Sequence, residues 1–388
     1  MQPVLLDLAA SSPLDPRVRD CLIQHLDEVH GNPSSRHALG TQAREAVEHA
    51  RRQLARCVGA APNSIVFTSG GTEANNLGIL GSVPKRGPGR ILVGPTEHAS
   101  VRLATAQLAK EGFDVETLRL TRDGQLDLDH ATERMNEDVL LVTQMLVSNE
   151  LGTHYPVKQL ARLAKARCGE VHFHCDGVQA LGKMDLDLED LGVDSLAISA
   201  HKIHGPKGQG ALAMGSNSRT GPLIFGGSQE KGMRPGTENV PSIAAFTLAA
   251  DLAHEGRQAF NESAKACHRE LEEALTGISL VYQDSMDGAH ILQTKGCVNS
   301  ICAVHLPGPP AEVWQHHLEK HGVFIGVGSA CQSTSKEVSP ALLALGLDAA
   351  SARQIARFSF SRETTPNDIG IAANALHKVA RSLEKLSP

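Results

Sequence analysis

Aromatic side chains are scarce in this sequence of 388 residues, where they make up 3% of the chain. Basic residues are not in excess either, because 37 Lys and Arg stand against 43 Asp and Glu and give a formal net charge of -6. Surfaces that bind nucleic acid combine positive charge with aromatic stacking. We therefore expect small molecules or other proteins as partners, and no nucleic acid.

Long apolar runs are also missing from the sequence. None approaches the roughly 20 residues that a membrane-spanning helix needs. The first residues, Met1–Asp7, lack the basic region ahead of an apolar stretch that is typical of a secretory signal. These features predict a cytoplasmic protein without membrane association.

The eight cysteines include no Cys-x-x-Cys pair. Their scattered spacing fits neither a disulfide framework nor a structural zinc site, so most are predicted to be reduced and buried. Cys331 is different, because residues 326–335 are small and polar and show neither helical nor strand periodicity. This pattern predicts a loop that carries an accessible, nucleophilic thiol.

Short apolar runs alternate with helical patterns between residues 60 and 215, as expected for an α/β domain. The helical stretches include Val101–Glu111 and Val157–Arg167, whose apolar residues recur every three or four positions. The strand-like runs are Ile65–Thr68, Arg90–Gly94, Val115–Leu120, Val139–Leu146, Glu170–Cys175, Ser195–Ala200 and Ala211–Met214. They predict a mostly parallel, seven-stranded sheet with helices on its faces.

The pattern of alternating apolar and helical runs changes after the Gly- and Pro-rich segment Gly221–Pro241. A helical pattern over Ser242–Glu255 follows, and further helices are expected near 260–275, 310–321 and 368–386. We predict a large domain over residues 14–256. Residues 1–13 and 257–388 are predicted to form a smaller α/β domain that carries the Cys331 loop.

The segment Phe67–Asn76 follows a predicted strand, passes Gly70 and Gly71, and opens a predicted helix with Thr72 in its first turn. Backbone N–H groups and the helix dipole favour an anion at such a turn. An ordinary glycine turn with a Ser or Thr cap would look the same, so this segment alone leaves both interpretations open.

A lysine lies at the end of another predicted strand, where Ser199 is followed by Ala200, His201 and Lys202. Ligands bind at the carboxyl ends of strands in open α/β sheets. An ammonium group there is costly to desolvate unless it is neutralised or bonded to a carbonyl as a Schiff base. A P-loop is excluded because Gly205–Gly210 lacks a Gly-Lys-Ser/Thr ending. The alternative that Lys202 is an ordinary surface lysine stays open.

An aspartate ends the strand that contains His172, His174 and Cys175. The carboxylate of Asp176 at this position could hold a protonated pyridine nitrogen. Metal binding by these residues and a turn-forming aspartate are the alternatives, but strand alternation places Cys175 on the face opposite to both histidines.

Two other predicted strands are followed by polar loops that contain His98 and Asn149. Five successive strand ends therefore carry side chains that can bind a ligand. Their convergence is far more specific than any single motif.

With these segments assembled, the chain resembles the fold-type I pyridoxal-phosphate enzymes of the class V aminotransferase group, and specifically the cysteine desulfurases and selenocysteine lyases. The matching segments are Leu6–Asp7, Gly31–His37, Phe67–Glu73, Ser199–Lys202, Ala356–Ser359 and Thr364–Thr365. They extend over almost the whole chain. The resemblance implies a fold-type I enzyme whose cofactor, pyridoxal 5'-phosphate, is bound to Lys202 as a Schiff base.

The resemblance also implies a role for each matching residue. It assigns the phosphate to Gly71, Thr72, Ser199 and His201, ring stacking to His98, the ring hydroxyl to Asn149 and Gln179, and the pyridine nitrogen to Asp176. Arg357, with Asn149, would bind the substrate. Thr237 matches a threonine that reaches the partner subunit's phosphate, which implies a homodimer.

The implied reaction removes sulfur from L-cysteine and yields L-alanine and a persulfide on Cys331, which passes to an acceptor protein of unknown identity. L-selenocysteine is an alternative substrate, because Gly226–Asn239 and Ser339–Leu343 are at least as similar to selenocysteine lyases. Transamination, decarboxylation or β-elimination would leave Cys331 without a role. A non-catalytic binding partner would need a broken site, yet every cofactor position holds a competent residue.

Overall fold

The computed structural model describes residues 3–84, 89–282, 285–292, 294–328 and 338–384. Its larger sheet has seven strands in the order β2-β8-β7-β6-β5-β3-β4. These strands are β2 (Ile65–Thr68), β3 (Arg90–Val93), β4 (Asp114–Thr117), β5 (Val139–Thr143), β6 (His172–Asp176), β7 (Ser195–Ser199) and β8 (Gly210–Met214). Because β8 alone runs antiparallel to both its neighbours, the prediction of a mostly parallel sheet is confirmed.

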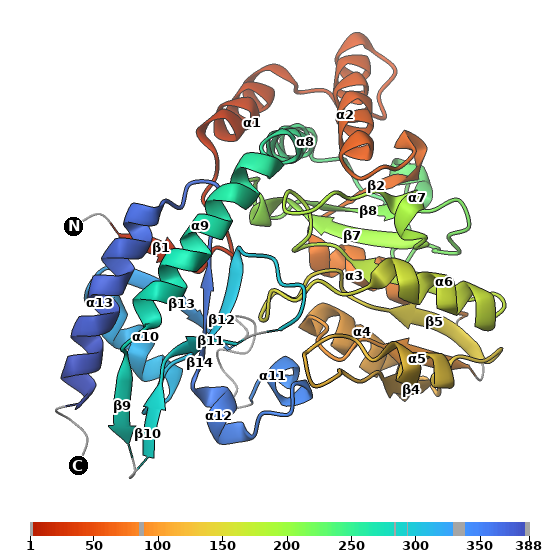
Figure 1. Ribbon diagram of the computed structural model, residues 1–388. Helices are drawn as coiled ribbons and strands as arrows, with labels where there is room; N and C mark the ends of the chain where they lie inside the picture. The colour runs from red at the N-terminus through yellow and green to blue at the C-terminus, as the bar shows by residue number, and fades with distance from the viewer. Residues whose placement is uncertain (1–2, 85–88, 283–284, 293, 329–337, 385–388) are drawn as a thin grey trace.

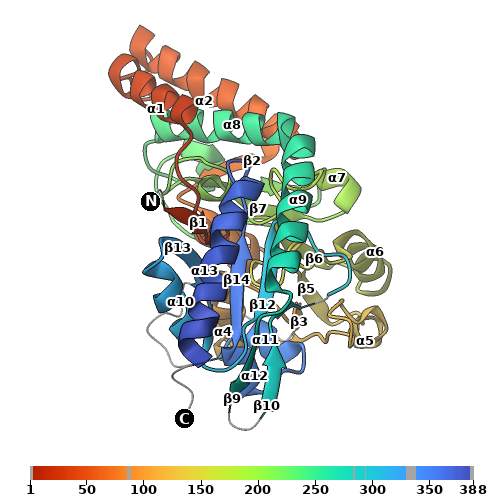
Figure 2. The ribbon, with the colours of Figure 1, turned by 60° about the vertical axis from the view of Figure 1, so that its left-hand side comes forward.

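Helices pack around this sheet and above one of its ends (Figure 1). They are α1 (Pro16–Glu28), α2 (Ala38–Cys57), α3 (Gly71–Leu80), α4 (Ala99–Lys110), α5 (Leu128–Arg134), α6 (Val157–Arg167), α7 (Leu188–Leu191) and α8 (Val240–Glu255). Both α1 and α2 contact α8, and the three form the part of the molecule that projects at the top of Figure 2.

The smaller sheet joins the N-terminal strand to the C-terminal third of the chain, in the order β1-β13-β14-β12-β11. Its strands are β1 (Val4–Leu6), β11 (His290–Ile291), β12 (Ile301–His305), β13 (Val323–Val327) and β14 (Ile355–Ser359), beside a hairpin of β9 (Ser279–Tyr282) and β10 (Ser285–Gly288). The helices of this part are α9 (Arg257–Leu275), α10 (Ala311–Glu319), α11 (Pro340–Ala344), α12 (Ala349–Arg353) and α13 (Pro366–Glu384). In both ribbon views α9 and α13 run side by side.

Two of the predicted strands end three residues too late. The run Val139–Leu146 forms a strand only to Thr143, and Val115–Leu120 is replaced by Asp114–Thr117. Met145 and Leu146 are nevertheless 2% and 1% exposed, and the Leu146 N–H still donates to the Asp176 carbonyl of β6 at 2.9 Å, so the core continues past the end of β5. The division at residues 256 and 257 stays a prediction, although the two sheets do use the residues expected for each part.

A buried ion pair ties together three elements at the edge of the large sheet. Arg51 of α2 donates to Glu230 through both terminal nitrogens, at 2.7 and 2.8 Å. Glu230 also accepts from the Phe67 backbone N–H of β2 at 2.8 Å, and its own backbone is left-handed, with φ of 47°. This pair therefore holds the irregular segment that leads to Thr237.

Glu230→Ala is expected to lower the free energy of unfolding by about 3–5 kcal/mol, because it leaves the Arg51 charge buried without its carboxylate. Urea denaturation measures the change. Glu170→Ala serves as the matched control, since the Glu170 side chain is 94% exposed in its ion pair with Arg219 and should contribute little. Equal losses in the two variants would contradict the interpretation.

Candidate cofactor site

A cavity of about 190 Å³ lies where the carboxyl ends of the central strands meet the N-terminal segment. Ten predicted site residues line it: Gly71, Thr72, His98, Asn149, Asp176, Gln179, Ser199, His201, Lys202 and Arg357. They come from both sheets and from loops that are far apart in sequence. The convergence that the sequence predicts is therefore present in the fold.

The turn between β2 and α3 forms one wall of the cavity. Gly70 has φ of 150°, which favours glycine, and it leaves the first turn of α3 without a side-chain cap. A Cβ at Gly71 would come within 2.7 Å of Val178 Cγ2. Across the turn, the buried hydroxyl of Ser199 has no hydrogen-bond partner among the described residues. Uncapped N–H groups and an unused hydroxyl together suit a phosphate group.

His201 and Thr72 line the same cavity. The His201 ring approaches Ser11 Oγ at 3.3 Å, and burial, reinforced by the Lys202, Lys207 and His98 charges, lowers its pKa to about 4. A neutral imidazole can donate one hydrogen bond to an anion, in keeping with the phosphate end of the site.

Asp176 ends β6 and is 4% exposed. Its Oδ1 accepts from the Val178 N–H at 3.0 Å, and its Oδ2 accepts from Asn75 Nδ2 at 2.8 Å. The buried carboxylate therefore has two fixed donors and faces the cavity, which suits a partnership with a ring nitrogen.

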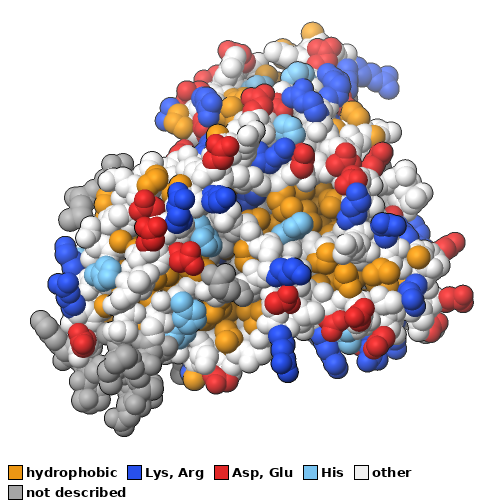
Figure 3. Space-filling view, in the orientation of Figure 1, with side chains coloured by type: hydrophobic (Ala, Val, Ile, Leu, Met, Phe, Trp, Pro, Cys, Tyr) orange, Lys and Arg blue, Asp and Glu red, His pale blue; other side chains and the backbone are white. Residues whose placement is uncertain are grey.

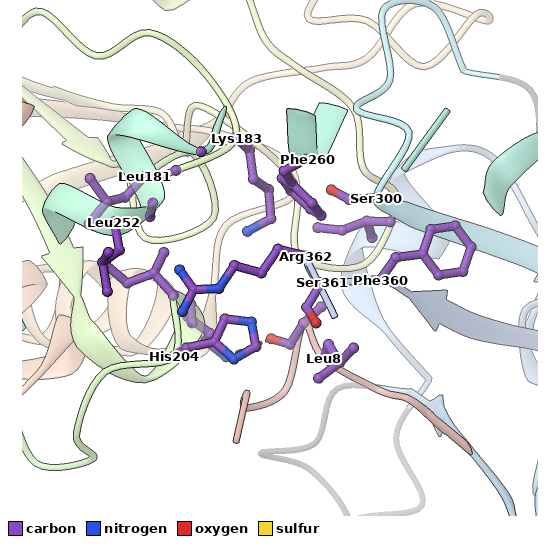
Figure 4. Close-up of a pocket in the computed structure, with 17 residues that line it drawn as sticks. Leu8, Leu181, Lys183, His204, Leu252, Phe260, Ser300, Phe360, Ser361 and Arg362 are labelled. Atoms are coloured by element: carbon purple, nitrogen blue, oxygen red, sulfur yellow. Dashed lines mark hydrogen bonds between the residues drawn. The ribbon is translucent and has the colours of Figure 1, made fainter. Parts of the chain in front are cut away.

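Lys202 lies in the short helical turn that follows β7, and its amine donates to the carbonyl oxygens of Ala9 and Ala10 at 2.6 and 2.7 Å. On its other side a second, smaller cavity of about 40 Å³ is lined by Lys183, His204 and Arg362 among apolar side chains (Figure 4). Burial and the charge of Lys202 lower the pKa of Lys183 to about 7. Lys202 thus lines both cavities.

His98 caps the N-terminus of α4, and its Nδ1 accepts from the Ser100 backbone N–H at 3.2 Å. Gln179 donates from Nε2 to the Ala9 carbonyl at 2.9 Å and accepts from the Lys183 amine at 3.2 Å. Both side chains are held by neighbours within this chain while they line the cavity.

Arg357 of β14 reaches the cavity from the smaller sheet, and its side chain is 5% exposed. Its terminal nitrogens donate to Asp7 at 2.6 Å and to the Asn149 carbonyl at 3.0 Å, whereas its buried Nε has no hydrogen-bond partner among the described residues. A guanidinium with an unused donor can bind a substrate carboxylate.

Two predicted residues lie elsewhere. Thr237 is exposed and does not line the cavity of its own chain. Cys331 lies outside the residues that the structure describes.

Several residues of the site have no obvious signal in the sequence. Asn75 and Ser100 line the cavity, and the carbonyl oxygens of Ala9 and Ala10 accept from Lys202. Glu97 lies behind the site, where burial, reinforced by the Asp176 charge, raises the pKa of its carboxyl well above the usual range. Only the polar loop that contains His98, Thr96–Ser100, indicated that polar residues gather there.

The residues present fit three groups of pyridoxal phosphate. The unpaired Ser199 hydroxyl and the α3 N-terminus suit the phosphate, the buried Asp176 carboxylate suits the ring nitrogen, and the Lys202 amine suits the aldehyde. No set of three or more His, Cys, Asp or Glu side chains suited to a metal ion occurs within the described ranges.

The surface in Figure 3 intersperses Lys and Arg with Asp and Glu rather than grouping charges of one sign. Across the described part of the chain, no helix is both long enough and apolar enough to span a bilayer.

Comparison with known proteins agrees with the geometry of the cofactor site. The chain matches the aminotransferase class-V family over residues 4–371. It is 34% identical over 386 residues to a putative cysteine desulfurase of Bacillus subtilis, a match that covers 99% of this chain and 100% of that protein. It is 34% identical to the mitochondrial cysteine desulfurase of Saccharomyces cerevisiae, across 100% of this chain and 77% of the yeast protein.

Solved structures agree with this relationship. A NifS-like protein superposes with a TM-score of 0.89 at 30% identity, over 98% of this chain and 100% of the other. The protein SspA in complex with cysteine gives a TM-score of 0.78 at 29% identity, over 92% of this chain and 98% of SspA. The chain therefore belongs to the aminotransferase class-V family of pyridoxal-phosphate enzymes and, within it, to the cysteine desulfurases.

Proposed function

We propose that this enzyme converts L-cysteine to L-alanine and leaves the sulfur as a persulfide on Cys331. The observation that supports this most strongly is the single cavity in which Lys202, Asp176, His98 and Arg357 meet. When bound, pyridoxal phosphate supplies an electron sink that allows the Cα–H bond of an amino acid to break.

Lys202 is the residue that we assign to proton transfer at Cα. Its amine lies at the boundary between the two cavities and can approach a substrate held in the larger one. Asp176 supports the positive charge of a ring nitrogen, since its carboxylate is buried and held by two donors. Arg357 positions the substrate by binding its carboxylate with a guanidinium that lines the cavity.

Cys331 is assigned as the sulfur acceptor because of its sequence context and its family. Its thiolate attacks the substrate sulfur, so that an S–S bond forms while the C–S bond breaks. The substrate carbon keeps the electron pair of that bond and takes up a proton, and L-alanine leaves. The persulfide is then available to an acceptor protein.

A direct assay tests the activity. Purified protein with pyridoxal phosphate is expected to form alanine from L-cysteine, with persulfide on the enzyme as the first sulfur product. Parallel assays with L-selenocysteine measure the preference between sulfur and selenium. Formation of pyruvate and ammonia instead of alanine would indicate β-elimination and contradict the proposal.

We also propose that the enzyme is a homodimer in which Thr237 completes the partner's site. Thr237 is exposed and lies outside its own cavity, and the nearby side chains of Leu223, Ile224 and Phe225 are 38%, 54% and 75% exposed. Consecutive exposed apolar side chains are typical of protein–protein contacts. The ion pair of Glu230 holds this segment in place.

Mixed dimers test the shared site. A dimer of one Thr237→Ala chain and one Lys202→Ala chain should contain one intact site and one with both defects, and thus keep about half of the wild-type activity. The control pairs a wild-type chain with a Thr237→Ala/Lys202→Ala chain, which should leave no intact site. Equal activity in the two preparations would refute the shared site.

A further inference from the structure

A buried row of polar side chains leads from β6 and β7 through α3 to the first turn of α4. We propose that Asn75 is a positioning residue that joins Asp176 and His98 into one hydrogen-bonded unit, and that His174 holds Asn75 in the required orientation. The inference rests on the roles proposed above for Asp176 and His98. It specifies which atom is the donor in every hydrogen bond of the row.

The orientation of Asn75 follows from its acceptors. A carboxylate can only accept hydrogen bonds, so the atom of Asn75 at 2.8 Å from Asp176 Oδ2 must be the amide nitrogen. The same nitrogen donates its second hydrogen to Ser100 Oγ at 2.9 Å. The carbonyl oxygen of Asn75 therefore points away from the cavity and needs a donor of its own.

His174 supplies that donor. Its Nε2 lies 2.9 Å from Asn75 Oδ1, so the ring must carry a proton on Nε2. Burial, with the His172 charge adding to it, lowers the pKa of His174 to about 3, so the ring is neutral and its Nδ1 has no proton. Ser195 Oγ, 2.8 Å from Nδ1, must then donate its hydrogen to His174.

The same reasoning continues one residue further. The Ser195 hydroxyl donates its only hydrogen to His174, so His172 Nε2, 2.9 Å from Ser195 Oγ, must donate to that oxygen. His172 Nδ1 ends the row as a buried nitrogen without a partner in the described part of the chain. Every hydrogen bond in the row therefore has its donor on the His172 side and its acceptor on the Asp176 side.

The branch toward His98 has the same property. Ser100 Oγ accepts from Asn75, so its hydrogen is directed to His98 Nδ1 at 2.8 Å. The backbone N–H of Ser100 also donates to this nitrogen. A neutral His98 must therefore carry its proton on Nε2, and Asn75 links this tautomer to the orientation of Asp176.

Tight packing keeps the row from rearranging. His174, Ser195 and Asn75 are each at most 1% exposed. A Cβ at Gly78, one turn after Asn75 on α3, would come within 2.4 Å of His174 Nδ1 and 3.1 Å of Ser195 Oγ. The His174 ring thus lies directly against the α3 backbone and cannot turn over without moving the helix.

Histidine tautomers can be measured by ¹⁵N NMR on the wild-type protein, without and with cofactor. His174 is expected to be protonated on Nε2 alone in the cofactor-free protein, and the neutral form of His98 is expected to carry its proton on Nε2. Protonation of His174 on Nδ1 would overturn the proposal. This measurement does not depend on the reaction, so a protein that forms no alanine but shows these tautomers would refute the function and leave the proton order standing.

A double-mutant cycle tests the linkage. Asn75→Leu and His174→Leu are each expected to lower kcat for alanine formation roughly 10- to 100-fold, as the loss of an outer partner does in other sites. The double variant should lose no more than Asn75→Leu alone, because His174 acts through Asn75. Losses that multiply would contradict the linkage.

His174→Gln is the conservative control, since Gln can donate from Nε2 and accept at Oε1. It is expected to recover most of the activity that His174→Leu loses. Protein reconstituted with pyridoxal phosphate labelled at its ring nitrogen gives a second readout, in which ring protonation should fall in His174→Leu and return in His174→Gln. Identical ring protonation in all three proteins would overturn the proposed linkage to Asp176.

Discussion

Lys202→Ala is expected to form no measurable alanine from L-cysteine. The substitution removes the amine that anchors the cofactor aldehyde and the group that moves the Cα proton, and general acid–base catalysis alone contributes roughly 10²- to 10⁴-fold in rate. The Lys202 amine donates to the backbone carbonyl oxygens of Ala9 and Ala10, so its removal is expected to leave the other cavity side chains in place.

Two measurements separate loss of chemistry from loss of fold. Alanine release reports the activity, and thermal unfolding of the cofactor-free protein reports the fold. Lys207→Ala is a matched control, because Lys207 lies five residues later in the same loop and is exposed. Normal alanine formation by Lys202→Ala would refute the assigned lysine.

Cys331→Ala is expected to lower alanine formation from L-cysteine by at least about 100-fold, the range that one positioned catalytic group contributes. A thiolate accepts the substrate sulfur, and no hydroxyl of the neighbouring Ser and Thr residues equals its nucleophilicity. The variant should still bind cofactor, because the residues proposed to hold the phosphate, the ring nitrogen and the aldehyde are Ser199, Asp176 and Lys202. The defect with L-selenocysteine should be smaller, since a selenol ionises more readily.

Mass spectrometry of the wild-type protein after treatment with L-cysteine should find the added sulfur on the peptide that contains Cys331. Cys21→Ala provides the control, because Cys21 lies on α1 and burial raises the pKa of its thiol. Cysteine turnover at the wild-type rate in Cys331→Ala, with no sulfur on that peptide, would replace the persulfide mechanism by β-elimination or transamination.

Much of the cofactor site was predictable because its residues lie in short segments next to the ends of strands. Five strands of the large sheet are followed by segments that carry polar side chains, and the carboxyl ends of parallel strands meet at one edge. Gly71, His98, Asp176 and Lys202 therefore converge without any knowledge of long-range contacts.

The alternation of apolar runs did not determine where strands stop. Leu146 and Leu118 are buried beyond the ends of β5 and β4, at 1% and 2% exposed, because the core extends past the sheet. A pattern of burial cannot distinguish pairing in a sheet from packing against one.

What the sequence alone determined is the set of chemical groups and the strand ends that carry them, since these depend on neighbours only a few positions away. The tertiary structure alone decided the partners of those groups. The Lys202 amine meets carbonyl oxygens 192 and 193 positions earlier in the chain, and Asn75 meets Asp176 across 101 positions. Such contacts form when helices and sheets pack together, and they cannot be predicted from the local periodicity of the sequence.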